Sequence, residues 1–132
     1  MRTKEQNVQL IKELSNANGV SGFEGEVAGI AKRETESFCD VKIDSLRNTY
    51  INPKSNKGRI CKVWLDAHSD EVGYIVQAVK PDGTLRFLAL GGSDLMNLPS
   101  NKVRVRNDDG EYISGIITSK PPHFMPEEER GK

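Results

Sequence analysis

The hydrophobic period of this chain changes from that of a helix to that of a strand, and this change limits the possible folds more than any other feature. Between Glu5 and Ser15, apolar residues recur at the spacing of one helix face. This pattern predicts an amphipathic helix that ends at Asn18-Gly19. Ser21 and Glu24 have the spacing of a capping box, so a second helix is expected from there to near Phe38.

Residues beyond position 40 show the period of a strand. Strands are expected at 41–43, 49–51 and 59–68. Two hairpins follow, one joining 72–79 to 84–90 across Pro81-Asp82-Gly83, the other joining 103–106 to 112–118 across Asp108-Asp109-Gly110. No helix signal follows residue 72, and the proline-rich tail 120–132 is expected to be disordered or a connector. The organisation predicts a seam between structural units at residues 71–73.

Composition excludes several partners. Nineteen basic and nineteen acidic residues balance, so no field attracts nucleic acid or an anionic membrane. No apolar run is long enough to span a membrane, and the first ten residues lack the apolar core of a secretory signal, so a cytoplasmic protein is expected. Cys39 and Cys61 are too few for a disulfide framework and are expected to be reduced and buried.

Ionisable residues interrupt an apolar run at "VWLDAHSDEVGYIV", residues 63–76. Along a strand, Asp66, His68 and Asp70 share one face and Glu71 lies on the other. A neutral imidazole binds zinc or cobalt well and usually gives its second N–H to a carboxylate, for which Asp70 is well placed. One histidine does not complete a metal site, so a structural histidine paired with a neighbouring acid is the alternative interpretation.

Four separated motifs carry a resemblance to a known family. "NGVSGFEGE", "DAHSDEVGYIV", "GTLRFLALGGSDLMNL" and "SGIITSKPPHF" follow one another between about Leu10 and Phe124. In this order and spacing they resemble the N-terminal part of the M42 family of metallo-aminopeptidases. That family includes glutamyl and tetrahedral aminopeptidases, and some members carry labels as cellulases or endoglucanases.

The resemblance implies an α/β fold in two incomplete parts. Residues 1–71 would be the N-terminal part of a cytoplasmic zinc-exopeptidase α/β domain. Residues 72–132 would be part of a β-rich inserted dimerisation domain, a small PDZ-like barrel, with a flexible tail. A homo-oligomer is therefore expected. Within the matching stretch, Arg47 stands where relatives usually have glycine, and Ser93 where an aromatic residue is common.

The resemblance also implies the chemistry. His68 matches the first metal ligand, and Asp70 matches the catalytic aspartate that orients it. The family uses two divalent ions, zinc or cobalt, bridged by a carboxylate and a water, to hydrolyse peptides. The other ligands and the glutamate base would lie beyond Lys132, so this chain alone is expected to be inactive, with binding of no metal as an open alternative. Glu71 and His123 also match family motifs and are expected to have structural or contact roles.

Two hypotheses follow. In the first, the chain is the N-terminal fragment of a divalent-metal-dependent aminopeptidase. In the second, it is a non-catalytic truncated module that self-associates through its β-rich half. A glycosidase needs two carboxylates on opposite sides of a sugar, which Asp66 and Asp70 on one strand face do not provide. "LGGSD" lacks the following helix that a nucleotide phosphate requires.

Overall fold

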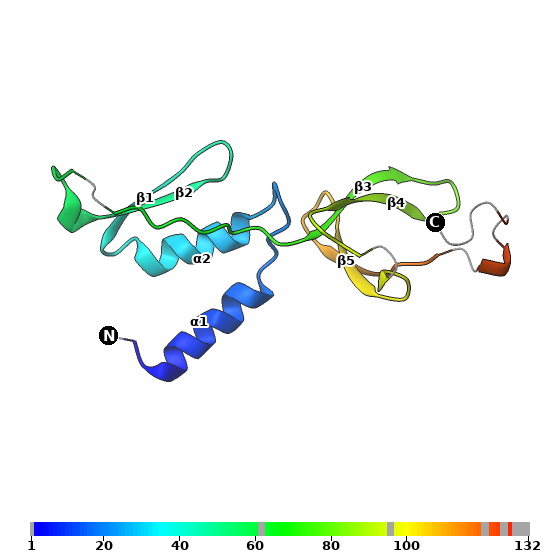
Figure 1. Ribbon diagram of the computed structural model, residues 1–132, viewed down its shortest axis with the longest axis horizontal. Coiled ribbons are helices and arrows are strands. Elements are labelled where there is room, and N and C mark those ends of the chain that lie inside the picture. The colour runs from blue at the N-terminus through cyan, green and yellow to red at the C-terminus, as the bar shows by residue number, and fades with distance from the viewer. Residues whose placement is uncertain (1, 61–62, 95–96, 120–121, 125–126, 128–132) are drawn as a thin grey trace. The chain divides into compact units, whose positions relative to one another are not determined.

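The computed structural model describes residues 2–60, 63–94, 97–119, 122–124 and 127 (Figure 1). The chain divides into two compact units, Met1–Ser93 and Asp94–Lys132. The described residues of the first unit form two α-helices, two hairpins and a short 3-10 helix, and those of the second include one hairpin and a short 3-10 helix. In the part of the chain described, no helix has the length and apolar character needed to cross a membrane.

Two helices open the chain, as the helical period predicts. Helix α1 spans Lys4–Asn16 and begins at a capping box, in which the Thr3 hydroxyl accepts the Gln6 N–H and the Gln6 side chain accepts the Thr3 N–H. Helix α2 spans Gly25–Thr35 and starts three residues later than a helix capped by Ser21 would. Its N-cap is Glu24, which makes no side-chain capping bond, so the predicted Ser21 capping box is wrong.

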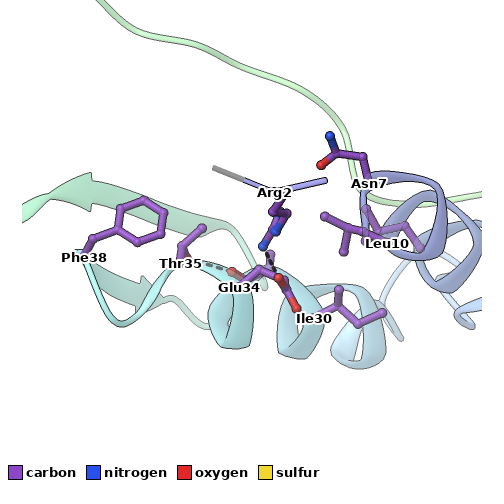
Figure 2. A pocket seen from close by; sticks show the side chains of 9 residues that line it. Arg2, Asn7, Leu10, Ile30, Glu34, Thr35 and Phe38 are labelled. Atoms are coloured by element: carbon purple, nitrogen blue, oxygen red, sulfur yellow. Dashed lines mark hydrogen bonds and ion pairs between the residues drawn. The ribbon is translucent and has the colours of Figure 1, made fainter. Parts of the chain in front are cut away.

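The helices meet through ion pairs and an open apolar groove. Arg33 binds both carboxylate oxygens of Glu13, at 2.8 and 2.7 Å, and Arg2 pairs with Glu34. Figure 2 shows Leu10 of α1 and Ile30 of α2 lining a groove of about 980 Å³. Buried side chains in the first unit are Ala28, Ile30 and Cys39, so little of its apolar surface is enclosed. Cys39 is reduced and buried as predicted, and Cys61 lies outside the described residues.

Two hairpins complete the first unit. Strands β1 (Cys39–Ile43) and β2 (Thr49–Pro53) pair antiparallel, with Ile43 opposite Thr49. A 3-10 helix, η1 (Lys54–Asn56), follows. Strands β3 (Gly73–Val79) and β4 (Leu85–Leu90) pair antiparallel with a bulge between Val76 and Ala78, across the predicted Pro81-Asp82-Gly83 turn. The hairpin of β3 and β4 is therefore confirmed, whereas β1 and β2 were predicted as strands without a prediction that they pair.

The second unit contains the last predicted hairpin. Strands β5 (Lys102–Arg106) and β6 (Tyr112–Ile116) pair antiparallel around the turn that ends at Gly110, whose φ is 86°. Ile117 is buried just after β6, and its N–H donates to the Asn101 carbonyl. The predicted tail lies mostly outside the described residues, and within it η3 (Pro122–Phe124) is a short 3-10 helix.

The predicted strand at 59–68 is not a strand in the described residues. Residues 63–70 belong to no ladder, and residues 61–62 are not described. Ile60 and Leu65 are 90% and 92% exposed. A strand exists only where a neighbouring strand completes its backbone hydrogen bonds, and here β1 and β2 pair with each other. The apolar composition of a segment favours a strand but does not show whether a neighbouring strand is available to pair with it.

Three separate two-stranded sheets make up the described β structure. The α/β content agrees with the expected fold class, but no closed barrel forms among the described strands, because each has one neighbour instead of two. The small PDZ-like barrel, like the division at residues 71 and 72, stays a prediction.

The turn between β1 and β2 places Arg47 in a backbone conformation that favours glycine. Arg47 has a φ of 65°, in the left-handed region that disfavours a side chain. Asp44 holds this turn by accepting the N–H groups of Leu46 and Asn48, each at 2.9 Å. The Asn48 side chain is the largest cause of a lowered pKa at Asp44.

Arg47→Gly is therefore expected to raise the free energy of unfolding by about 1 kcal/mol, because glycine adopts this φ without the Cβ clash. Urea denaturation followed by circular dichroism measures the change. Arg47→Ala is the matched control, since it removes the same guanidinium but retains a Cβ and should give no gain. Equal stability of the glycine and alanine variants would contradict the backbone explanation.

Candidate metal-binding site

The loop between the helices lies against the segment that leads into β3. Val20 and Glu71 form an isolated parallel bridge. The Glu71 N–H donates to the Gly19 carbonyl at 2.7 Å, and the Gly19 N–H donates to the Glu71 carboxylate at 3.1 Å. Glu71 thus binds both the backbone N–H and the backbone carbonyl of Gly19, which lies far from it along the chain. We call this pair of bonds the Gly19–Glu71 clamp.

Glycines permit the close approach at the clamp. A Cβ built on Gly73 would lie 2.5 Å from Cγ2 of Val20, which is far inside van der Waals contact. A Cβ on Gly19 would lie 3.0 Å from Cγ2 of Val27 and 3.3 Å from the Ser69 carbonyl oxygen. The first two motifs of the sequence, 18–26 and 66–76, therefore meet in space.

His68 and Asp70 lie together beside this clamp. Nδ1 of His68 is 3.1 Å from Oδ1 of Asp70 and 3.1 Å from the Asp70 backbone oxygen. The His68 side chain is 87% exposed and that of Asp70 is 41% exposed. The imidazole is held on one side and open to solvent elsewhere.

Ser21 completes a three-residue chain of hydrogen bonds. Its hydroxyl donates to Oδ2 of Asp70, the oxygen that His68 does not use. The bond from Ser21 and then the bond from His68 lower the pKa of Asp70, because both donors favour the ionised carboxylate. The carboxylate is thus charged and held at both oxygens.

The remaining predicted residues lie apart from this arrangement. Glu71 serves the backbone clamp, and no hydrogen bond or ion pair joins Asp66 to His68 among the described residues. His123 belongs to the other unit, where its ring is 5.2 Å from that of Phe124. Among the residues described, no three His, Cys, Asp or Glu side chains cluster as a metal site would require. The geometry therefore fits one oriented ligand and its partner, and the metal roles of His68 and Asp70 stay predictions.

Sequence reasoning missed Ser21 as a member of the site. Its spacing to Glu24 favoured a capping role, but its partner is 49 positions away along the chain. Instead, the Glu24 carboxylate accepts the Gly22 N–H at 2.7 Å. No local pattern reports a contact over that separation, although Ser21 does lie within one of the four motifs.

Two family models match separate parts of this chain. The M42 glutamyl aminopeptidase family matches residues 48–132, and a family described as AMPT matches residues 5–28. The lysyl aminopeptidase of Pyrococcus furiosus is 33% identical over 123 residues, covering 90% of this chain and 34% of the relative. The glutamyl aminopeptidase of Lactococcus lactis is 29% identical over 116 residues, covering 87% and 33%.

Solved structures resemble this chain closely. A TET aminopeptidase from a Thaumarchaeota archaeon matches with a TM-score of 0.76 and 36% identity, covering 97% of this chain and 35% of that one. The TET1 peptidase of Pyrococcus horikoshii, which can assemble into a tetrahedron or a large octahedral shell, matches at 0.69 and 26%, covering 94% and 36%. A Thermotoga maritima structure labelled endoglucanase matches at 0.65 and 33%, covering 85% and 34%.

This chain matches only part of each relative, which limits what the relatives say about its function. This chain spans about one third of the length of the curated relatives it matches. The expected endoglucanase label among relatives is confirmed. An activity described for a relative belongs to a chain about three times as long.

The close approach of Gly73 to Val20 gives a test of how the two motifs meet. Gly73→Ala is expected to lower the free energy of unfolding by about 1–3 kcal/mol, because the new methyl group has no space. Val20→Ala removes the two γ carbons in the way, so the double variant should recover part of that loss. A double-mutant cycle from urea denaturation measures this coupling. Simple additivity of the two changes would contradict the packing described.

Proposed function

Because this chain belongs to the M42 glutamyl aminopeptidase family, we propose that it forms the N-terminal part of a divalent-metal-dependent aminopeptidase. The complete enzyme would remove residues from the N-terminus of peptides. The matched relatives are aminopeptidases, which supports a peptidase function. Since the chain spans about one third of their length, activity is proposed for the complete enzyme and inactivity for these residues alone.

The oriented imidazole of His68 is the observation that carries this proposal. Its Nδ1 faces Asp70, and its side chain is largely exposed, so Nε2 is accessible to an ion. A histidine that binds a metal usually gives its other nitrogen to a carboxylate, as His68 does. We therefore assign His68 as a metal ligand and Asp70 as the residue that orients it.

The proposed metal centre uses two divalent ions, zinc or cobalt. Such ions polarise the peptide carbonyl and lower the pKa of a bound water. Zinc at a catalytic site takes about three protein ligands, and the described residues offer one. His68 and Asp70 would thus provide one oriented corner of the centre, with the other ligands supplied by the rest of the family's fold.

The substrate proposed here is a peptide with a free N-terminus. One matched relative is a lysyl and another a glutamyl aminopeptidase, so relatives at similar identity differ in the residue they remove. The proposal accordingly extends to the peptide class and not to a particular N-terminal residue.

Self-association is proposed for the complete enzyme. The matched TET1 peptidase can assemble into closed shells. On β6 of this chain, the apolar side chains of Ile113 and Ile116 are exposed, which is consistent with surface reserved for contacts. This assembly is also the feature that the non-catalytic alternative would retain.

His68→Ala is expected to abolish the binding of Co²⁺ to the chain. In a titration of the ¹⁵N-labelled protein with Co²⁺, amide signals near residues 68–70 should broaden first, because the paramagnetic ion binds at Nε2 of His68. With one protein ligand the binding should be weaker than in a complete site.

His123→Ala is the matched control, since it removes the other histidine of the chain and should leave the broadening unchanged. Broadening that survives in His68→Ala would contradict the assigned ligand. Absence of any binding, together with self-association in sedimentation experiments, would favour the non-catalytic module.

Activity can be tested in a chimera. Residues 1–132 would replace the matching N-terminal third of the P. furiosus lysyl aminopeptidase. The chimera is expected to hydrolyse an aminoacyl chromogenic substrate, to lose activity with a chelator, and to lose more than about 100-fold in kcat/KM on His68→Ala. The His123→Ala chimera should keep its activity. A chimera that assembles like its parent but is inactive with His68 intact would contradict the proposed function.

A further inference from the structure

The Asp70 carboxylate is shared between two donors, one to each oxygen. Oδ2 accepts the hydroxyl of Ser21, and Oδ1 lies 3.1 Å from Nδ1 of His68. An aspartate carboxylate turns easily about its last torsion, and Asp70 is partly exposed. The hydrogen bond from Ser21 therefore limits the orientation of the oxygen that faces His68.

The surroundings of His68 determine which ring nitrogen carries the hydrogen. The two atoms within reach of Nδ1 are a carboxylate oxygen and a backbone carbonyl oxygen, and both are acceptors only. Nδ1 must therefore donate. In the neutral ring, Nε2 then carries the lone pair, which is the form a metal ion requires.

We propose that Ser21 is a positioning residue of the metal centre: its hydroxyl fixes the Asp70 carboxylate so that His68 keeps its hydrogen on Nδ1 and its lone pair on Nε2. The importance of Ser21 for catalysis rests on the proposed function, in which His68 is a metal ligand. The effect of Ser21 on the tautomer of His68 does not rest on that function, because it is present before any metal binds.

The backbone brings Ser21 to Asp70 without help from its hydroxyl. The Gly19–Glu71 clamp and the Val20–Glu71 bridge fix the residues immediately before Ser21. After it, the Phe23 N–H donates to the Val20 carbonyl at 2.7 Å. Ser21 itself is exposed, so the small change to alanine or threonine has space. Removal of the hydroxyl should leave this loop in place.

The experiment reads the tautomer of His68 in the metal-free chain. Long-range ¹H–¹⁵N spectra of the histidine-labelled protein, at about pH 8 where imidazole is ordinarily neutral, distinguish a protonated ring nitrogen from a bare one. The original chain should show hydrogen on Nδ1. Ser21→Ala should move part of the population to hydrogen on Nε2, and Ser21→Thr, which keeps a hydroxyl, should restore the original pattern. Ser69→Ala is the matched control, since its hydroxyl makes no hydrogen bond among the described residues.

Two results would overturn the proposal. One is a His68 tautomer in Ser21→Ala that equals that of the original chain. The other is a change in Ser21→Ala that Ser21→Thr does not reverse, because the effect would then come from the loop and not from the hydroxyl.

A Co²⁺ titration of the same variants tests whether Ser21 also affects metal binding. The affinity should fall about 10-fold in Ser21→Ala and recover in Ser21→Thr, as is usual when the partner of a metal ligand loses its support. If Co²⁺ fails to bind even the original chain while the tautomer changes as expected, the positioning role stands and the proposed metal function fails. An unchanged Co²⁺ affinity in Ser21→Ala, where the original chain binds, would overturn the link to the metal centre.

Discussion

The Gly19–Glu71 clamp is the contact on which the candidate site depends. It joins two segments about fifty residues apart, and closing so long a loop costs conformational entropy that local structure does not offset. One of its two bonds uses a charged acceptor, which makes it stronger than a bond between neutral groups. Ser21 and Asp70 are neighbours because this clamp lies beside them.

The clamp also explains why an apolar run carries so many ionisable groups. Glu71 uses its carboxylate to bind the backbone of the helix-connecting loop, and Asp70 uses its carboxylate to bind Ser21 and His68. One acid therefore fixes the loop, and the next acid uses a residue of that loop to fix the imidazole. The carboxylates of Asp70 and Glu71 thus act in the same network of hydrogen bonds, and neither is an unpaired charge.

Local and non-local features of this chain were predictable to very different degrees. The two helices and the hairpins β3–β4 and β5–β6 followed from hydrophobic period and turn residues, because these signals act within a few positions. Residues of β1 and β2 were predicted as strands, but their pairing was not predicted. The contact of His68 with Asp70 was also local. The strand expected at 59–68 and the capping role of Ser21 were wrong for the same reason, since each depended on what a distant segment provides. The left-handed backbone of Arg47 was not predicted, because the sequence alone marked this position only as a departure from the family.

The exposed apolar side chains of residues 60–65 and the single metal-ligand candidate His68 have a common explanation. Leu65, which is 92% exposed, and Ile60 need neighbouring strands to be buried, and a catalytic metal needs more ligands than His68. The exposed apolar residues and His68 all lie within residues 60–68, and the chain spans about one third of the length of its relatives. Neighbouring strands that covered Ile60 and Leu65 would also bring their ends beside His68, where loops of α/β proteins gather functional groups. In the proposed metal centre, the hydrogen bonds of Ser21 and Asp70 would orient the imidazole before an ion binds, so that less ordering would remain for the ion to impose.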